Sequence, residues 1–148
     1  MIEYKQAQKE KLPEIVALNH KIFLGMYSWA PYTLSEYEDR LSSVSPVIFI
    51  AEENEKIIGD SIAFEKDGVW YLWILGVHSD YRKQGIANHL FEMNEEYAKA
   101  HGYHKIVIKI YTVSLAMIEL AKKRGYCITK NGGEKENEER FIIIELVL

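Results

Sequence analysis

The stretch "SDYRKQGIANHLFE", Ser79 to Glu92, decides how this 148-residue chain is interpreted. Two basic residues, a glycine and an alanine come directly before a run whose apolar residues recur at helical spacing. The first backbone N–H groups of a helix have no partner inside it, and the helix dipole adds partial positive charge there. Because Gly85 has no side chain and Ala87 a small one, a phosphate group can approach these amides closely. The stretch therefore predicts an anion-binding turn, to which Arg82 and Lys83 add charge.

Two better-known phosphate-binding patterns do not fit this turn. Ala87 and Asn88 offer no hydroxyl for a magnesium ion, which the P-loop pattern requires. The sequence also lacks a G-x-G-x-x-G run with a ribose-binding acid downstream. A simpler alternative stays open at this point, in which Gly85 only permits a turn into a surface helix.

The nine residues "VWYLWILGV", Val69 to Val77, precede the turn and predict a strand that is apolar on both faces. Such strands lie in the centre of a sheet. Gly76 interrupts the apolar run, and a glycine inside a strand indicates a bulge or the close approach of another backbone. The sequence thus predicts a central strand that leads into the anion-binding turn.

The rest of the chain alternates between strand and helix patterns, and Asp67-Gly68 marks a tight turn between two strands. Thr33 and Glu36 fit a capping box, and Gly102 fits the end of a helix. The order β-α-α-β-β-β-α-β-α-β-β predicts an α+β fold: a mixed sheet of about seven strands flanked by four helices, in a single domain spanning 1–148. The predicted strands cover 2–7, 47–51, 57–64, 69–77, 106–111, 126–130 and 140–148, and the predicted helices 12–26, 33–41, 86–101 and 114–124.

Composition and charge exclude several classes of protein. The net charge of −4 argues against a nucleic-acid partner, and the longest apolar run is too short to span a membrane. A single cysteine, Cys127, excludes a disulfide framework and a cysteine-rich zinc site, and we expect no metal. The first five residues do not resemble a signal peptide. These features together predict a cytoplasmic location.

Arg82-Lys83-Gln84-Gly85-Ile86-Ala87, following "LWILGVHSDY", resembles the acetyl-CoA signature of the GNAT superfamily of N-acetyltransferases. The opening "IEYKQAQKEKLPEIVAL" is similar to the first strand and helix of that family, and "SLAMIELAKKRGY" resembles its second CoA-facing segment. The resemblance covers essentially the whole chain. It implies a GNAT-like fold and an acetyl-CoA-dependent N-acetyltransferase. The acceptor would be a primary amine of a small molecule or peptide that attacks directly in a ternary complex, and a homodimer is possible.

The resemblance also implies roles for individual positions. The amides of Arg82, Lys83, Gln84, Gly85, Ile86 and Ala87 would hold the pyrophosphate of CoA. The pantetheine arm would lie along Leu75, Gly76 and Val77, at a bulge where the central strand splays from its neighbour. The Leu75 amide would polarise the thioester carbonyl. Ser114 stands where the family often has asparagine, and we expect it at the cofactor site.

Two departures from the family pattern affect the catalytic prediction. Ala121 occupies the position where the family often has a tyrosine that protonates the departing thiolate. Tyr111 or Ser114 is the candidate substitute, although Tyr111 also suits a sheet face. A thiol with a pKa near 8.5 is a fair leaving group without such help. No carboxylate stands in Tyr71-Leu72-Trp73, where some members carry a base, and His78 is a candidate base or a turn residue.

The resemblance also implies that the acceptor pocket is shaped by the segment between the first two helices and by the last hairpin, and aromatic residues are frequent near the first of these. Tyr27, Trp29 and Tyr32 fall within six residues, and alternation places Tyr71 and Trp73 on one face of the central strand. They indicate a pocket for an apolar or cationic amine, or else core packing. The acidic run "EKENEE" suits a cationic acceptor or a solvated hairpin tip.

Three other functions stay open from the sequence. The first is a non-catalytic acyl-CoA-binding module, because the usual tyrosine and glutamate are missing. The second keeps the enzyme but changes the acyl donor. The third is a covalent route through Cys127, which would need an activating group that the sequence does not reveal.

Overall fold

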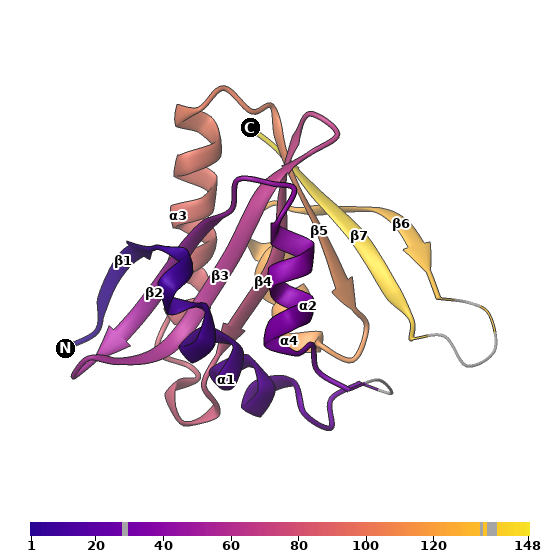
Figure 1. The fold of residues 1–148 in the computed structure, drawn as a ribbon. Helices are drawn as coiled ribbons and strands as arrows, with labels where there is room; N and C mark the ends of the chain where they lie inside the picture. Colours follow the sequence, from indigo (N-terminus) through magenta and orange to yellow (C-terminus); the bar gives the residue numbers. More distant parts are fainter. Residues whose placement is uncertain (28–29, 134, 136–138) are drawn as a thin grey trace.

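A computed structural model of the chain describes residues 1–27, 30–133, 135 and 139–148. The described residues form one seven-stranded mixed sheet with helices on both faces (Figure 1). The predicted order of elements and the α+β class are confirmed. The elements are β1 (Glu3–Ala7), α1 (Leu12–Phe23), α2 (Leu34–Leu41), β2 (Val47–Glu53), β3 (Lys56–Lys66), β4 (Val69–Val77), α3 (Ile86–Ala100), β5 (Lys105–Tyr111), α4 (Leu115–Lys123), β6 (Cys127–Gly132) and β7 (Phe141–Val147), with short 3-10 turns η1 (Lys9–Lys11) and η2 (Ser79–Tyr81).

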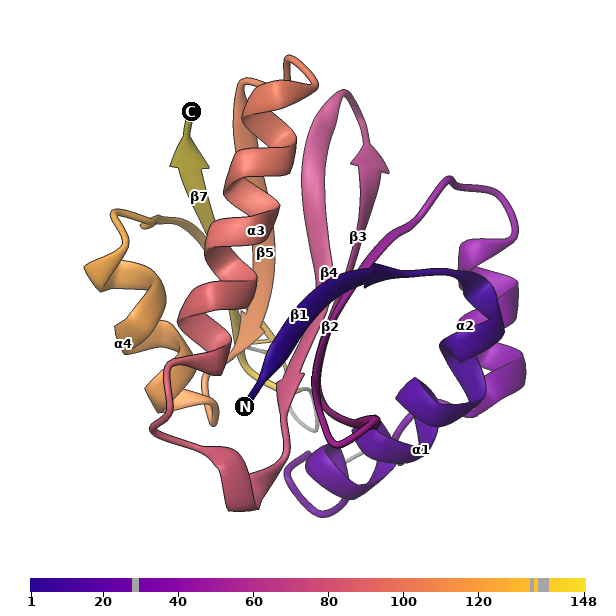
Figure 2. The ribbon, with the colours of Figure 1, turned by 90° about the vertical axis from the view of Figure 1, so that its left-hand side faces the viewer.

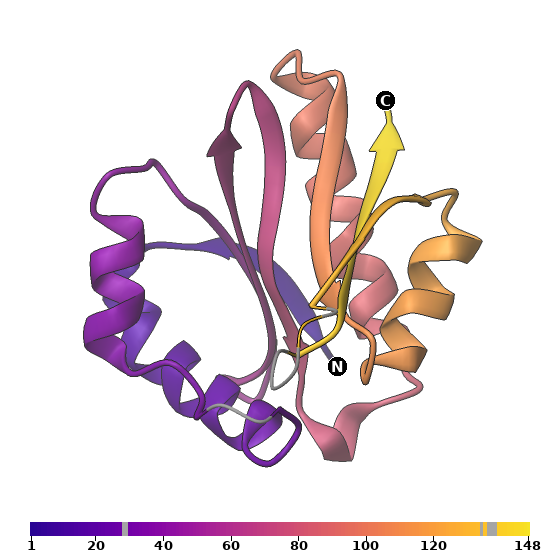
Figure 3. The ribbon, with the colours of Figure 1, turned by 90° about the vertical axis from the view of Figure 1, so that its right-hand side faces the viewer.

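The strands follow the order β1-β2-β3-β4-β5-β7-β6 across the sheet. Neighbouring strands run antiparallel except β4 and β5, which are parallel. Helices α1 and α2 cover one face of the sheet, and α3 and α4 cover the other (Figures 2 and 3). Each face buries its own apolar core. Leu90 and Phe91 are central on the α3 side, whereas Ile15, Tyr37 and Leu41 are central on the α1 side.

The local signals at the helix ends act as the sequence predicts. Thr33 Oγ1 accepts a hydrogen bond from the Glu36 amide at 3.2 Å, and the Glu36 side chain accepts one from the Thr33 amide at 3.0 Å. This reciprocal capping box satisfies two backbone N–H groups that a helix start leaves without partners. At the C-terminal end of α3, Gly102 adopts a φ of +80°, a left-handed conformation that favours glycine.

The β2–β3 hairpin extends beyond its apolar pattern. The predicted strands end at Ala51 and begin at Ile57, whereas the structure continues the ladder through charged residues to the turn at Asn54. Glu52 is buried there, and it forms an ion pair with Lys5 of β1 at 2.6 Å. The last pairs of β2 thus include a charged side chain that is partnered by the edge strand β1. An apolar pattern does not reveal such pairs, so the sequence placed the end of β2 too early.

The bulge in the central strand lies at Trp73 and not at Gly76, so of the two interpretations of this glycine, a bulge or a close approach, the structure supports the close approach. In the β3–β4 register, Ile62 pairs with Ile74 but Ala63 pairs with Leu72, which leaves Trp73 as the extra residue. The extra residue reverses the alternation of β4. Leu75 and Val77 therefore pack with the α3 core instead of the α1 core. Gly76 serves a close approach instead, because a Cβ there would lie 3.0 Å from Asn19 Oδ1 of α1.

Candidate active site

A cleft opens in the middle of the sheet because β4 and β5 pair over only part of their length. The parallel register joins Trp70 to Ile106, Tyr71 to Val107 and Leu72 to Ile108, and it ends there. Both strands continue, β4 to Val77 and β5 to Tyr111. Their facing edges separate beyond Leu72, and the pantetheine residues predicted from the sequence lie along this separated part of β4.

The main-chain groups of Leu75 and Val77 face this cleft. The His78 amide donates to the Ile58 carbonyl of β3 at 2.8 Å, and the register continues through Val77 opposite Gly59 to Leu75 opposite Ser61. Hydrogen-bonded pairs alternate along an antiparallel ladder. Val77 and Leu75 fall at the positions whose N–H and C=O groups point away from β3. These groups are therefore directed toward β5, where the strands have separated.

One cavity of about 730 Å³ extends from the start of α3 through this cleft to the segment between α1 and α2. It gathers nearly all of the predicted site residues. Those that line it are Tyr27, Tyr32, Tyr71, Trp73, Leu75, Gly76, Val77, Arg82, Lys83, Gly85, Ile86, Ala87, Tyr111 and Ser114. Gln84 is exposed in the same turn but is not a lining residue, and Trp29 lies outside the described residues.

The α3 end of the cavity has the geometry of an anion site. Gly85 is the N-cap of α3 with a φ of +77°, and having no side chain it cannot cap the amides that follow. A Cβ built at Gly85 would meet no described atom within 4 Å, so the space before these amides is open. Lys83 also has a positive φ, of 65°, and the side chains of Lys83 and Arg82 are both exposed. The turn presents backbone donors and positive charge to the same end of the cavity.

Tyr111 and Ser114 lie together where β5 leads into α4. The Tyr27 and Ser114 hydroxyls are 3.3 Å apart, and the Tyr27 and Tyr111 rings are centred 4.9 Å apart. Tyr27 thus connects the end of α1 to the start of α4 across the cavity. Burial raises the pKa of Tyr111, and the nearby Glu139 carboxylate raises it further, while the Arg40 charge opposes them. Tyr111 therefore keeps its proton at neutral pH.

The opposite end of the cavity is aromatic. The Trp73 ring is centred 5.2 Å from Tyr37 and 6.0 Å from Tyr32, and Tyr71 packs on Phe64 at 5.6 Å. Trp73 is only half-buried and lines the cavity, so it belongs to the α1 core and to the cavity wall at once. The two sequence-based alternatives for Trp73, pocket wall and core packing, are not exclusive.

Three residues considered from the sequence lie elsewhere. His78 Nδ1 accepts the Asp80 amide at 3.1 Å at the start of η2, and His78 is not a lining residue. Cys127 is exposed on β6, also away from the lining residues. Ala121 is fully buried on the inner side of α4. His78 thus has the turn position that was the alternative to its role as a base.

A buried polar cluster behind the cleft was not predicted. Asn19 of α1 donates to the Tyr37 hydroxyl at 3.2 Å and to Asp60 Oδ1 of β3 at 3.0 Å, and Asp60 pairs with Gly76 in the sheet. Asn19 Oδ1 and Asp60 Oδ2 are buried without a hydrogen-bond partner among the described residues. Burial raises the pKa of Asp60 to about 7, against the opposing effect of the Asn19 hydrogen bond. A lone acid within the apolar run "KIIGDSIAF" was the sequence signal for this cluster.

Asp60→Asn is expected to increase the free energy of unfolding more at pH 8 than at pH 5. The carboxyl is neutral in the folded protein up to about pH 7 but ionises near 3.8 when exposed. As the pH rises from 3.8 to about 7, the Asp60 carboxyl is ionised in the unfolded chain but still protonated in the folded protein. The wild type therefore loses stability over this range, whereas the variant does not. The gain should grow by about 3 kcal/mol between pH 5 and pH 8, measured by urea unfolding. Exposed Asp67→Asn is the control, and an equal gain at both pH values would contradict the prediction.

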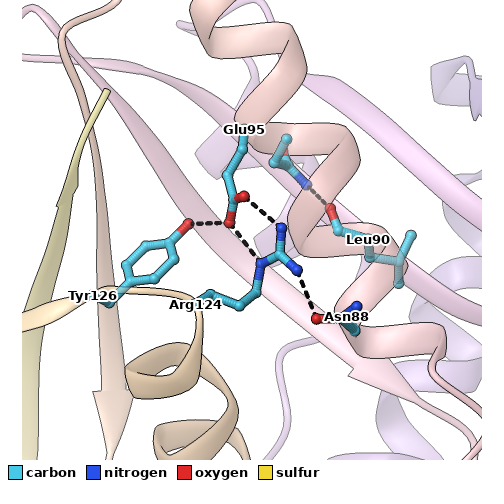
Figure 4. A network of polar contacts seen from close by, with 6 residues as sticks. Asn88, Leu90, Glu95, Arg124 and Tyr126 are labelled. Carbon is cyan, nitrogen blue, oxygen red and sulfur yellow. Dashed lines mark hydrogen bonds and ion pairs between the residues drawn. The ribbon is translucent and has the colours of Figure 1, made fainter.

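A second network holds α4 against α3 (Figure 4). Arg124 donates two hydrogen bonds to the Glu95 carboxylate, at 2.6 and 2.9 Å, and a third to Asn88 Oδ1 at 2.6 Å. The Tyr126 hydroxyl donates to the same carboxylate at 3.1 Å. Asn88 lies in the first turn of α3 and lines the cavity. The network therefore joins the Gly125-Tyr126 segment to the helix start where the sequence predicts an anion site.

Comparisons with known proteins agree with this geometry. The acetyltransferase (GNAT) family model matches residues 12–126. An acetyltransferase of Pectobacterium atrosepticum is 31% identical over 98 residues, which are 64% of this chain and 70% of the relative. The fold and the cleft define an acyltransferase. The chain belongs to the GNAT family of acetyltransferases, as its sequence resemblance predicted.

Solved structures confirm the fold. The ribosomal-protein-S18-alanine N-acetyltransferase of Escherichia coli superposes with a TM-score of 0.82 at 16% identity, covering 99% of this chain and 94% of the other. The NatC complex bound to Gag peptide and CoA contains a chain that superposes with a TM-score of 0.78 at 22% identity, covering 99% and 98%. The GNAT fold uses acetyl-CoA.

Two features are absent from the described part of the chain, a membrane-spanning helix and a group of metal ligands. None of its helices has both the length and the apolar character needed to cross a bilayer. In the same residues no three His, Cys, Asp or Glu side chains are grouped as ligands for a metal ion.

Proposed function

We propose that this protein transfers an acetyl group from acetyl-CoA to a primary amine of a small molecule or peptide. The amine attacks directly while both reactants are bound. The observation that carries the proposal is the single cavity, which joins the anion-binding turn of α3 to the aromatic end through the split between β4 and β5. Because one cavity reaches both ends, it suits a ternary complex.

The residues present fit acetyl-CoA. The open N-terminus of α3, with Arg82 and Lys83 beside it, would hold the pyrophosphate. The cleft-facing main-chain groups of Leu75 and Val77 would hold the pantetheine amides as an added strand would. When bound, the cofactor supplies the acetyl group as a reactive thioester.

The chain's own groups then have separate tasks. The Leu75 amide, directed into the cleft, is positioned to polarise a carbonyl oxygen. Tyr111 keeps its proton and would donate it, or a hydrogen bond, toward the leaving sulfur. The incoming amine must be neutral to attack, and Asp60 with its pKa of about 7 lies behind Gly76 without lining the cavity. We therefore assign no general base.

The test is steady-state kinetics with acetyl-CoA and a panel of amines, measured by release of free thiol. Acetylated amine and initial-rate lines that intersect are expected for a ternary complex. Parallel lines would instead indicate a covalent intermediate. Tight CoA binding without turnover on any amine would favour an acyl-CoA-binding module. A donor series from acetyl to longer acyl chains decides the preferred acyl group.

Tyr111→Phe is expected to lower kcat about 10- to 100-fold at saturating acetyl-CoA. The effect lies at or below the range typical of general acids because the departing thiol has a pKa near 8.5. Phenylalanine keeps the ring contacts with Tyr27 and Phe141, so only the hydroxyl is removed. An unchanged kcat would exclude Tyr111 as a proton donor. The control is Tyr103→Phe, because the Tyr103 hydroxyl donates to Glu65 and neither residue lines the cavity.

A further inference from the structure

Arg40 lies at the aromatic end of the cavity, in the last turn of α2. Its guanidinium carbon is 5.2 Å from the centre of the Trp73 ring and 6.0 Å from that of the Tyr32 ring. Arg40 lines the cavity together with both rings. Contacts between a guanidinium and aromatic faces favour one orientation of the flat group. The rings that the sequence suggested for a cationic acceptor thus already contact a cation of the protein.

The guanidinium is not used to hold the fold together. Among the described residues it donates no hydrogen bond and forms no ion pair. Two acids of its own helix, Glu36 and Asp39, share a small surface hollow with Arg40. Glu36 is occupied in the capping box, and neither acid lines the main cavity. Arg40 therefore keeps its hydrogen-bond donors for a group that enters the cavity.

The charge of Arg40 acts across the cavity. It lowers the pKa of Tyr71 and of Tyr111, against the stronger effect of burial on each. The other cations that line the cavity in the described residues lie elsewhere: Arg82 and Lys83 at the start of α3, and Lys109 against the Tyr111 and Phe141 rings. The aromatic end therefore has its own positive charge, separate from the anion site at α3.

We infer that Arg40 binds a carboxylate of the acceptor, so that the acetylated amine belongs to a molecule with an acidic group and an apolar body between the two. A guanidinium presents paired N–H donors that match the two oxygens of a carboxylate. The Trp73 and Tyr32 rings would contact the apolar body. A second cation would be repelled at the same place, so a cationic body is disfavoured. This inference rests on the proposed function, because it names the acceptor class for that reaction.

The test compares two acceptors that differ only at the end remote from the amine: 4-(aminomethyl)benzoate and 4-(aminomethyl)benzamide. Their amines have similar environments, so the difference reports on the acidic group. We expect kcat/KM at least about 10-fold higher for the benzoate, because hydrogen bonds between charged groups are about twice as strong as neutral ones. A series of ω-amino acids and their amides then measures the preferred distance between amine and carboxylate.

Arg40→Gln is expected to remove the preference, mainly through KM, and Arg40→Lys to keep part of it. Asp39→Asn should increase the preference, because it removes the acid nearest to Arg40 in sequence. Lys66→Gln is the matched control: Lys66 lies 4.8 Å from the Tyr71 ring but does not line the cavity, so the preference should be unchanged. Equal kcat/KM for the two acceptors in the wild type, or a preference that survives in Arg40→Gln, would overturn the inference.

A binding measurement distinguishes failure of the proposed function from failure of the carboxylate site. If no amine is acetylated, calorimetric titration of 4-(aminomethyl)benzoate into the CoA-loaded protein still tests Arg40. Binding that is at least about 10-fold weaker in Arg40→Gln would support the carboxylate site without catalysis. Equal binding of benzoate and benzamide to the wild type would overturn it. Thermal unfolding of each variant establishes that it is folded, which is expected because Arg40 is exposed.

Discussion

Gly85→Glu is expected to weaken the binding of coenzyme A about 1000-fold, since like charges in contact cost several kcal/mol and each 1.4 kcal/mol is a factor of ten. Gly85 is the N-cap of α3 and lines the cavity, and the space around its Cα is open. A carboxylate there occupies the place of the pyrophosphate beside the first amides of the helix. Isothermal titration calorimetry with CoA measures the effect.

A matched variant separates charge from backbone strain. Gly85 has a φ of +77°, and Gly102 at the other end of α3 has a φ of +80° with equally open surroundings. Any side chain at either position costs about 1–2 kcal/mol in the left-handed conformation. Gly102→Glu should lose similar stability but keep its affinity for CoA, because Gly102 does not line the cavity. If Gly85→Glu binds CoA as tightly as Gly102→Glu, the anion site is not at the start of α3.

Glu95→Ala is expected to lower the free energy of unfolding by about 3–5 kcal/mol, the usual cost of removing one partner of a buried ion pair. Both side chains of the Glu95–Arg124 pair are largely buried, and the Tyr126 hydroxyl depends on the same carboxylate. The variant leaves the guanidinium and the hydroxyl without their acceptor. For a chain of this size the midpoint of thermal unfolding should fall by about 10 °C. Exposed Glu96→Ala on the same helix is the control.

A triple variant tests whether the loss comes from the uncompensated charge. Replacing Glu95 and Arg124 by methionine and Tyr126 by phenylalanine removes the members of the network that are shielded from water, while Asn88 is exposed to solvent. Buried ion pairs are often replaced by apolar groups at little cost. The triple variant should therefore be more stable than Glu95→Ala alone. If it is less stable, the network contributes through its hydrogen bonds more than through the avoided cost of a lone charge.

The sequence was sufficient for features that depend on neighbouring residues. The glycine-containing turn into α3, the Thr33 capping box and the central strand at 69–77 are local patterns of charge, capping and hydrophobicity, and the structure has each of them; anion binding by the turn stays a prediction. The gathering of Tyr27, Tyr111 and Ser114 at one cavity was available only through the family resemblance, because these residues come from elements far apart in the chain.

Other features depend on tertiary contacts that no local pattern contains. The bulge shifts register at Trp73, although an apolar run such as "YLWILGV" gives no sign of where one residue is extra. Arg40 falls in a helix whose charges resemble those of any solvated face, and only the packing of α2 beside β4 brings it to the cavity. Asp60 did have a visible signal, but its partner Asn19, and Tyr37, to which Asn19 also donates, come from two other elements.

The bulge at Trp73 limits how this chain can change during evolution. A one-residue slip of β4 beyond Leu72 that keeps Trp73 would remove the bulge and exchange the two faces of the strand, which turns Leu75 and Val77 toward α1 and removes their backbone groups from the cleft. Substitutions that favour such a slip should therefore be rare among descendants. Arg40 belongs to a separate helix. Acceptor preference is thus free to diversify by point substitution in α2 while the acetyl-CoA half stays the same.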